Sequence, residues 1–141
     1  MGRLDVQFLD KGLHRVLFDA MPLPVFVVDG DVNILEYNAA AARLLVEGWQ
    51  TRKHWRGGDV LQCLHAIETP GGCGRAPACS RCGLREAVSA AFRGQPVKRQ
   101  WAAMEFNRKG KPAKVNLRVS CQPFTYGKSD FVLLVLEGLG N

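Results

Sequence analysis

The stretch MPLPVFVVDGDVNILEYNAAAARLL, residues 21–45, decides the fold. Two short apolar runs, Val25 to Val28 and Val32 to Tyr37, flank Asp29-Gly30-Asp31, and the glycine of this turn can take a positive φ that reverses the chain. Asn38 follows the second run and is suited to cap a short helix through the alanines that come next. The stretch therefore predicts a β-hairpin that leads directly into a helix.

Elements on both sides of the hairpin can be predicted from their periodicity. The apolar residues between Val6 and Met21 recur every three or four positions, as an amphipathic helix requires. Pro22 and Pro24 end this helix, because a proline disfavours helical backbone in the residue before it. After the hairpin we expect a short helix at about Asp59 to Ala66, followed by a loop rich in glycine, proline and cysteine.

A longer helix is predicted to open at Ser80, to bury one apolar face and to close at Gly94 and Pro96. The last third of the chain alternates strand-like runs with turns made of glycine and charged residues. These runs cover about Val97 to Phe106, Ala113 to Phe124 and Asp130 to Leu136. Hairpin strands interrupted by a block of helices indicate an α+β domain with an antiparallel sheet.

The composition fits one small domain, because 141 residues with 47% hydrophobic content can supply a single core. The apolar runs are far shorter than the roughly 20 residues that cross a bilayer, and residues 1–9 lack the pattern of a signal peptide, so we expect a cytoplasmic protein without membrane contact. The net charge is +6, but the basic residues are dispersed from Arg3 to Lys128, which favours a solvated surface over nucleic-acid binding. The sequence holds no recognisable catalytic motif, so an enzyme is not expected.

The order of these elements resembles the PAS family of sensory domains. The residues that carry the resemblance are the opening stretch at 21–45, LREAVSAAF at 84–92, KPAKVNLRVSCQPF at 111–124 and FVLLVLEGL at 131–139. The resemblance implies a five-stranded antiparallel sheet with short helices packed on one face, which binds a small ligand or pairs with another copy and passes its state to an effector. We therefore divide the chain into an N-terminal helix at 1–21 and one PAS-like domain at 22–141.

The resemblance also implies partners. Asn141 follows the last predicted strand at once, so we expect the effector, such as a histidine kinase or a regulator, on a separate partner, unless the chain is an excised module. We expect a homodimer as well. Its predicted contact is the apolar stripe of the N-terminal helix, made of Leu9, Leu13, Val16 and Leu17. The alternative for this stripe is packing on the chain's own sheet.

A cysteine-rich insert at about residues 63–82 is the most informative part of the sequence. Cys63, Cys73, Cys79 and Cys82 are separated by nine, five and two residues, and the close spacing of the last pair lets two thiolates grip one metal ion. Four thiolates are the usual ligands of structural zinc and of iron–sulfur clusters. The sequence therefore predicts a four-cysteine metal site, occupied by zinc or by an iron–sulfur cluster.

Neighbouring residues fit such a site. If Ser80 caps the following helix, Cys79 and Cys82 lie at its N-terminal end, where free N–H groups favour anionic sulfur. Three arginines are close enough in sequence to offset the negative charge of the thiolates: Arg75, Arg81 and Arg85. His65 is a possible substitute ligand or haem ligand, but beside four cysteines a role as neighbouring or surface side chain is simpler.

Two other cysteine chemistries stay open. The four cysteines can be disulfide-bonded or switchable thiols, and the spacing of Cys79 and Cys82 matches a thioredoxin-like motif, although no strand is predicted before it. Cys121 is in phase with the inward residues of its strand and is expected in the core. The tryptophans are interpreted as packing or interface residues: Trp49, Trp55 and Trp101.

Three functions are compatible with these features. The first is a sensor in which a metal in the insert responds to oxygen, nitric oxide or redox state. The second is a ligand-binding or dimerisation module in which zinc only stabilises the insert. The third is a thiol–disulfide redox protein that uses Cys79 and Cys82.

Overall fold

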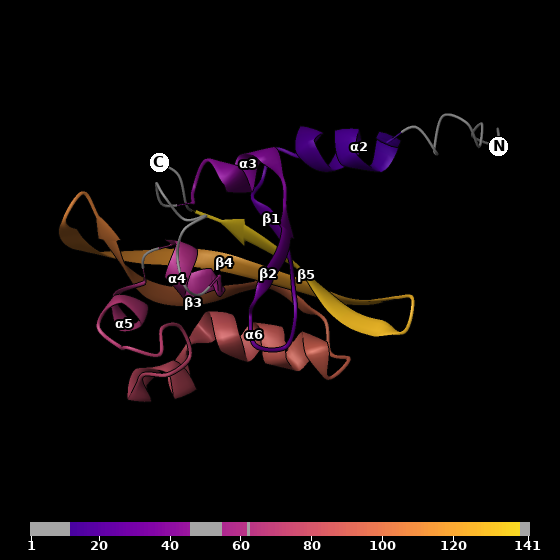
Figure 1. The fold of residues 1–141 in the computed structure, drawn as a ribbon. Coiled ribbons are helices and arrows are strands. Elements are labelled where there is room, and N and C mark those ends of the chain that lie inside the picture. Colours follow the sequence, from indigo (N-terminus) through magenta and orange to yellow (C-terminus); the bar gives the residue numbers. More distant parts are fainter. Residues whose placement is uncertain (1–11, 46–54, 62, 139–141) are drawn as a thin grey trace, which may run out of the picture.

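The computed structural model describes residues 12–45, 55–61 and 63–138, which form one antiparallel sheet with helices around it (Figure 1). The sheet has five strands in the order β2-β1-β5-β4-β3. The strands are β1 (Val25–Val28), β2 (Ile34–Tyr37), β3 (Val97–Arg108), β4 (Lys111–Tyr126) and β5 (Ser129–Glu137). The predicted α+β class and the five-stranded antiparallel sheet are confirmed. The last three strands are longer than predicted, because their pairing continues to the hairpin turns.

The opening hairpin forms as predicted and is placed in the sheet by its apolar residues. Phe26 in β1 lies opposite Tyr37 in β2 and opposite Leu134 in β5, so β1 is an inner strand of the sheet. The Phe26 side chain is fully buried. Burial of such a side chain contributes about 1.5–3 kcal/mol, which is sufficient to fix the register of a strand of four residues.

Asn38 caps helix α3 (Ala39–Ala42), as the sequence predicts. Its Oδ1 accepts a hydrogen bond from the N–H of Ala41 at 2.9 Å and a second from the N–H of Val25 at 3.0 Å, while its Nδ2 donates to the carbonyl oxygen of Leu23. The side chain is fully buried and uses both of its polar atoms. Asn38 therefore holds the start of β1 against the end of β2 as well as starting the helix.

The turn between β1 and β2 differs from the prediction in one detail. Its positive φ lies at Val32, with φ of 63°, and not at Gly30. A β-branched residue adopts this conformation only when its surroundings compensate for the strain. Val32 is buried, donates to the carbonyl oxygen of Asp29 at 3.1 Å and accepts from the N–H of Gly57 at 3.0 Å. At Gly30 the space is tight for another reason: a Cβ there would lie 3.2 Å from the ring of Phe92.

One face of the sheet carries the core. Helix α6 (Gly83–Phe92) contacts β3, β4 and β5, and Figure 1 shows α5 and α6 on the same side of these strands. The helix buries Leu84, Ala87, Val88 and Ala91 of its predicted apolar face. Phe92, which was predicted to be buried with them, is 41% exposed at the end of the helix. Cys121 lies in this core at 2% exposure, so its predicted place is confirmed.

The start of α6 was predicted wrongly. Ser80 does not cap it; Ser80 belongs to a short 3-10 helix, η3 (Pro77–Arg81), and its hydroxyl donates to the carbonyl oxygen of Pro77 at 3.0 Å. The residue at the N-cap of α6 is Cys82, whose backbone is extended. Cys82 therefore lies at the N-terminal end of the helix as predicted, whereas Cys79 lies one turn earlier, in η3.

The segment between Trp55 and Cys63 runs from one edge of the sheet to the other. Near β2, Arg56 forms a bridge with Asn33, and the N–H of Ile34 donates to the carbonyl oxygen of Trp55 at 2.9 Å. At the opposite edge, Cys63 forms a bridge with Phe106 of β3.

The prediction of a single helix at about 59–66 is wrong, because Cys63 forms its bridge with β3 in the middle of that range. The structure has two short helices instead, α4 (Gly57–Leu61) and α5 (Leu64–Ile67). Cys63 must be extended to pair with β3, so the helix cannot continue through it.

Helix α2 (His14–Ala20) precedes the sheet and ends before Pro22, as predicted. It buries none of its residues, and Figure 1 shows it extending away from the sheet. Its main attachment is Arg15, which donates to Glu36 at 3.2 Å and to the carbonyl oxygen of Tyr37 at 3.1 Å. The predicted helix began at residue 6, and residues 6–11 lie outside the described part.

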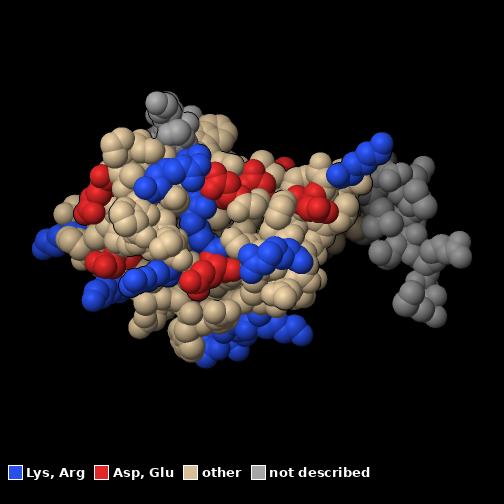
Figure 2. All heavy atoms as spheres, turned by 90° about the horizontal axis from the view of Figure 1, so that it is seen from below, with Lys and Arg blue, Asp and Glu red and all other residues tan. Residues whose placement is uncertain are grey.

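Among the described residues, no helix combines the length and the apolar character needed to cross a membrane. Figure 2 shows one face of the molecule, on which Lys and Arg side chains are interspersed with acidic ones.

Candidate metal centre

The four cysteines of the insert line one cavity of about 110 Å³, although the chain brings them there from separate segments. Cys63 precedes α5, Cys73 lies in the loop after α5, Cys79 belongs to η3, and Cys82 precedes α6. The wall of the cavity is completed by α6 and by β3, including Leu84 and Met104. The cavity therefore lies between the insert and the core of the domain.

The cysteines differ in their access to solvent. Cys63 and Cys73 are buried, with 8% and 7% of their surface exposed, whereas Cys79 and Cys82 are half-buried. All four have free thiols, as does Cys121. Cys79 and Cys82 are thus the two cysteines with more surface open to solvent.

Backbone N–H groups hydrogen-bond to two of the sulfurs in the same way. Burial raises the pKa of the Cys63 thiol, and hydrogen bonds from the backbone of Ala66 and His65 oppose this effect. Burial likewise raises the pKa of Cys82, opposed by the backbone of Arg85 and Leu84. Each sulfur therefore lies over the first turn of a helix, where N–H groups stabilise a negative charge.

Cys121 shows what burial does without such groups. Burial alone raises the pKa of its thiol to about 12. Cys121 lies in the core and does not line the cavity. The N–H groups at Cys63 and Cys82 thus distinguish the cysteines of the insert from a purely structural one.

Gly58 allows two of the cysteines to approach each other. A Cβ at this position would lie 3.0 Å from the sulfur of Cys73 and 3.1 Å from the Cβ of Cys63. These distances are shorter than normal van der Waals contacts, so a side chain at Gly58 would push Cys63 and Cys73 outward. The absence of a side chain there is a condition for the present shape of the cavity.

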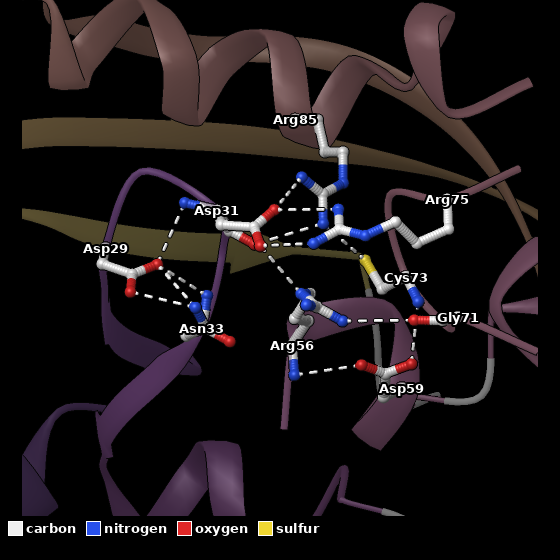
Figure 3. Close-up of polar contacts among 9 residues, drawn as sticks. All are labelled: Asp29, Asp31, Asn33, Arg56, Asp59, Gly71, Cys73, Arg75 and Arg85. Atoms are coloured by element: carbon white, nitrogen blue, oxygen red, sulfur yellow. Dashed lines mark hydrogen bonds and ion pairs between the residues drawn. The ribbon is translucent and has the colours of Figure 1, made fainter. Parts of the chain in front are cut away.

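Polar contacts fix Cys73 from two sides (Figure 3). Its backbone N–H donates to Oδ1 of Asp59 at 2.8 Å. Its sulfur accepts a hydrogen bond from Nη2 of Arg85 at 3.3 Å. The second oxygen of Asp59 accepts from the N–H of Arg56 at 3.2 Å, so Asp59 also holds the start of α4.

Asp31, in the turn between β1 and β2, is surrounded by three arginines. It accepts from Nη1 of Arg85 at 2.8 Å, from Nε of Arg56 at 2.9 Å and from Nη2 of Arg75 at 3.0 Å. Partial burial would raise the pKa of Asp31, but the hydrogen bonds from Arg75, Arg85 and Arg56 outweigh it and hold the pKa well below its usual range. Asp31 is therefore ionised and connects the hairpin to three separate segments, which are the start of α4, the loop of the insert and α6.

The donor set and its surroundings suit a metal ion that prefers sulfur. Four thiols can bind zinc or an iron–sulfur cluster as thiolates, and three guanidinium groups lie around Asp31 beside them. In the described residues, however, no three His, Cys, Asp or Glu side chains form a complete ligand group as they stand. Binding would therefore require the sulfurs to turn inward around the ion. The cavity leaves room for this movement.

Comparisons with known proteins agree with the fold. The PAS domain family matches residues 12–75. The PAS domain of nitrogen regulation protein NR(II) from Vibrio parahaemolyticus is 15% identical, with a TM-score of 0.53, over 90% of this chain and 98% of that one. Residues 12–75 match the PAS domain family, and the sheet as a whole has the PAS fold.

Two further solved structures have the same fold. A domain of the sensory box sensor histidine kinase/response regulator from Geobacter sulfurreducens is 17% identical, with a TM-score of 0.52, over 95% of this chain and 98% of that one. The Rhodobacter sphaeroides LOV protein is 14% identical, with a TM-score of 0.54, over 96% and 69% of the two chains. Among curated proteins, none matches the sequence.

The predicted PAS domain is thus confirmed, while the metal site of its insert stays a prediction. The family match includes Cys63 and Cys73 and ends at residue 75, before Cys79 and Cys82. Asp31, Arg56 and Asp59 were not predicted to belong to the site. Asp31 follows the PAS domain's first strand by three residues, and the sequence signal available for it was only a second acidic residue in a turn.

The histidine and the tryptophans discussed in the sequence analysis differ in their position and exposure. His65 lines the cavity beside the cysteines, so it is a neighbouring side chain with access to them. Trp101 is 61% exposed on β3, where its ring is covered by the guanidinium of Arg118 at 4.1 Å from the ring centre. Trp55 is exposed as well. Trp49 lies outside the described residues.

Proposed function

We propose that this PAS domain is a sensory module whose signal enters through a metal at Cys63, Cys73, Cys79 and Cys82. The observation that supports this most is the convergence of all four cysteines on one cavity. An iron–sulfur cluster or zinc is the cofactor that such a set would hold, and the module would respond to redox state or to a gas such as oxygen or nitric oxide. We expect no catalytic activity of its own.

The position of the cavity supports a sensory role over a purely structural one. One side of the cavity is formed by β3 and α6, which contribute to the core. A change in the ligand set would therefore displace residues that belong to the sheet or pack on it. The half-buried Cys79 and Cys82 leave the other side accessible to a small molecule. A site that only stabilises the insert needs neither feature. The thiolates persist best in a reducing compartment, so we expect the protein to act in the cytoplasm.

A thiol–disulfide enzyme receives less support. The reactive thiol of such an enzyme has a lowered pKa, whereas burial raises the pKa of Cys82. Cys79 and Cys82 also flank the end of a 3-10 helix, and no strand leads into them. We therefore assign both cysteines to the metal site.

Metal analysis of the full chain, purified without oxygen, tests the proposal. We expect bound zinc, or iron with acid-labile sulfide and visible absorption, in an amount that corresponds to one site per chain. Iron with sulfide would favour the redox or gas sensor, whereas redox-silent zinc would favour a structural site with signalling through the sheet. Protein that contains neither, and that takes up neither after reconstitution, would contradict the metal site. Turnover of a disulfide substrate by the metal-free protein would favour the thiol enzyme.

We propose that the module passes its signal to an effector of the histidine-kinase type. The structure from Geobacter sulfurreducens belongs, by its description, to a sensor histidine kinase/response regulator. A domain of the same fold, again by its description, comes from a two-component sensor histidine kinase. These are properties of those proteins, and they support the same kind of partner for this one.

We also propose a homodimer that forms through α2. Val16 and Leu17 are 63% and 57% exposed, so they do not pack on the chain's own sheet, which was the alternative for this stripe. Leu13 is half-buried at the start of the helix, and Leu9 lies outside the described residues. Two exposed aliphatic residues on adjacent positions of a short helix are well placed for a second copy of the same helix.

Charged substitutions test this dimer without affecting the core. A Val16→Glu/Leu17→Glu variant is expected to sediment as a monomer at concentrations where the parent chain is a dimer, because four carboxylates would meet in the interface. Tyr126→Glu is the control, since Tyr126 is 79% exposed at the β4–β5 hairpin. A parent chain that is monomeric, or a double variant that stays dimeric, would exclude α2 as the contact.

A further inference from the structure

Arg85 contacts the four-cysteine cavity twice. Its backbone hydrogen-bonds to the sulfur of Cys82, three residues earlier in the chain. Its guanidinium donates to the sulfur of Cys73 from Nη2 at 3.3 Å. Arg85 therefore touches one cysteine at the start of α6 and another in the loop of the insert. The other arginines of the insert have no such contact among the described hydrogen bonds.

The same guanidinium holds the turn between β1 and β2. Nη1 donates to Oδ1 of Asp31 at 2.8 Å, and Nη2 donates to the carbonyl oxygen of Asp31 at 3.1 Å. The side chain of Arg85 is only 16% exposed. Figure 3 shows it between the turn and Cys73. One planar group thus joins a sulfur of the cavity to both the side chain and the backbone of Asp31.

Gly74 leaves room for this arrangement. Its φ is +87°, and a Cβ on it would clash with the guanidinium of Arg85. The loop that carries Cys73 therefore packs directly on Arg85, and the side chain has little freedom to move. Its Nε is buried and has no hydrogen-bond partner among the described residues. A buried guanidinium that leaves one donor unused is held by its remaining contacts, which are those to Asp31 and Cys73.

These contacts must respond to the charge on sulfur. A neutral thiol is a weak acceptor, whereas a sulfur that carries negative charge as a metal ligand accepts a stronger, charge-assisted hydrogen bond. Arg85 would therefore interact more favourably with the cavity when a metal is bound. Because Arg85 interacts more strongly with the metal-bound cavity than with the metal-free one, it favours the metal-bound state. By linkage, metal binding in turn favours the arrangement in which Arg85 also holds Asp31.

We propose that Arg85 is a positioning residue that couples metal occupancy of the four-cysteine cavity to the order of the β1–β2 turn. This inference rests on the proposed metal site and adds the route by which its state reaches the sheet. The turn leads into β1, which is an inner strand paired with β2 and β5. Metal binding strengthens the hydrogen bond from Arg85 to Cys73. The hydrogen bonds from the same guanidinium to Asp31 become more ordered with it.

Cobalt(II) titration of the reduced full chain tests the first half of the coupling. Co(II) replaces zinc in thiolate sites and gives absorption that reports directly on its sulfur ligands. Arg85→Gln is expected to lower the Co(II) affinity about tenfold or more, the usual effect of losing an outer hydrogen-bond partner, and to shift the sulfur-to-cobalt absorption band. Arg75→Gln is the matched control. It removes another arginine from Asp31 without touching a sulfur, so the band should not move.

Hydrogen exchange of residues 29–33 tests the second half. Saturating Co(II) should slow exchange in this turn of the parent chain, because coupling between two sites is reciprocal, and by no more than the factor that Arg85→Gln takes from the affinity. In Arg85→Gln the metal should leave the exchange unchanged. Arg85→Lys should recover part of the affinity through its charge. It should not restore the protection, since one ammonium group lacks the fork that reaches Asp31 and Cys73 together.

The outcomes separate this inference from the proposed function. A parent chain that does not bind Co(II) would overturn both. Co(II) binding with the same affinity and spectrum in Arg85→Gln, or turn protection that persists in that variant, would overturn the coupling and leave the metal site standing. Arg85→Lys, which keeps the buried positive charge beside Asp31, provides the same readouts if Arg85→Gln does not fold.

Discussion

Cys82→Ala should abolish metal-dependent stabilisation of this PAS domain. With the parent chain at a free zinc concentration of about 1,000 times its dissociation constant, mass action adds about 4 kcal/mol to the free energy of unfolding. The variant has three cysteines left around the cavity. We expect its zinc affinity to fall by more than about 1,000-fold, well beyond the effect typical of outer partners, so that less than about 0.5 kcal/mol of the added stability is left. Urea unfolding with and without zinc measures both quantities.

The physical reason lies in the place of Cys82. It is the N-cap residue of α6, its sulfur receives hydrogen bonds from the backbone of Arg85 and Leu84, and it is half-buried at the cavity. Removal of this sulfur takes away the ligand that connects the metal to the main helix of the core. Without metal, the loss is small, because a half-buried cysteine contributes little packing.

Cys121→Ala is the control for the same experiment. It also removes one thiol from the chain, but this thiol is buried in the core and does not line the cavity. We expect a modest loss of stability, about 1 kcal/mol from the small cavity, that is equal with and without zinc. A zinc-dependent gain that survives in Cys82→Ala would be incompatible with the proposed ligand set. Equal loss of that gain in both variants would point to an indirect effect on the fold.

Local patterns were sufficient to predict much of the fold. The alternation of apolar residues gave the strands, because one face of each strand is buried against α6 and the other is not. Asn38 could be identified as a cap from its position alone, although its contacts to Val25 and Leu23 could not. The four cysteines could be grouped because their spacing is short. Their convergence on one cavity fits that interpretation.

Two of the errors share one cause, which is contact between residues far apart in sequence. The helix expected at 59–66 is broken because Cys63 pairs with Phe106 at the edge of β3. Asp31 went unrecognised because its arginine partners are 25, 44 and 54 residues away. Nothing in the local sequence of a turn shows that a distant helix will bring a guanidinium to it. The surroundings of the candidate site depend on these contacts and could not be predicted, whereas the four-cysteine ligand set stays a prediction.

Gly74, which follows Cys73, allows a direct test of the contacts around the four-cysteine cavity. Gly74→Ala is expected to destabilise the domain by about 2 kcal/mol more than Gly110→Ala, in the absence of metal. Both glycines have positive φ, +87° and +81°, so an alanine brings a similar backbone strain of about 1–2 kcal/mol at either position. At Gly110 nothing lies within 4 Å of the new Cβ, whereas at Gly74 the Cβ would collide with the guanidinium of Arg85.

The additional loss arises from the contacts that Arg85 must give up. A long side chain can usually swing away from a clash, but this one is 16% exposed and is bound to Asp31 and Cys73. Hydrogen bonds to charged groups contribute about 1.5–3 kcal/mol each, so displacement of the guanidinium accounts for the expected difference. Urea unfolding of the two variants, with unchanged dependence on urea concentration, gives the two free energies directly.

A double variant decides whether Arg85 is the cause. In an Arg85→Ala background the collision is absent, and the cost of Gly74→Ala should fall to that of Gly110→Ala, which appears as an interaction energy of about 2 kcal/mol in the mutant cycle. If Gly74→Ala costs the same with and without Arg85, the guanidinium moves aside freely and does not hold the loop. A cycle with the expected sign would show that the loop carrying Cys73 packs against the Arg85 side chain of α6.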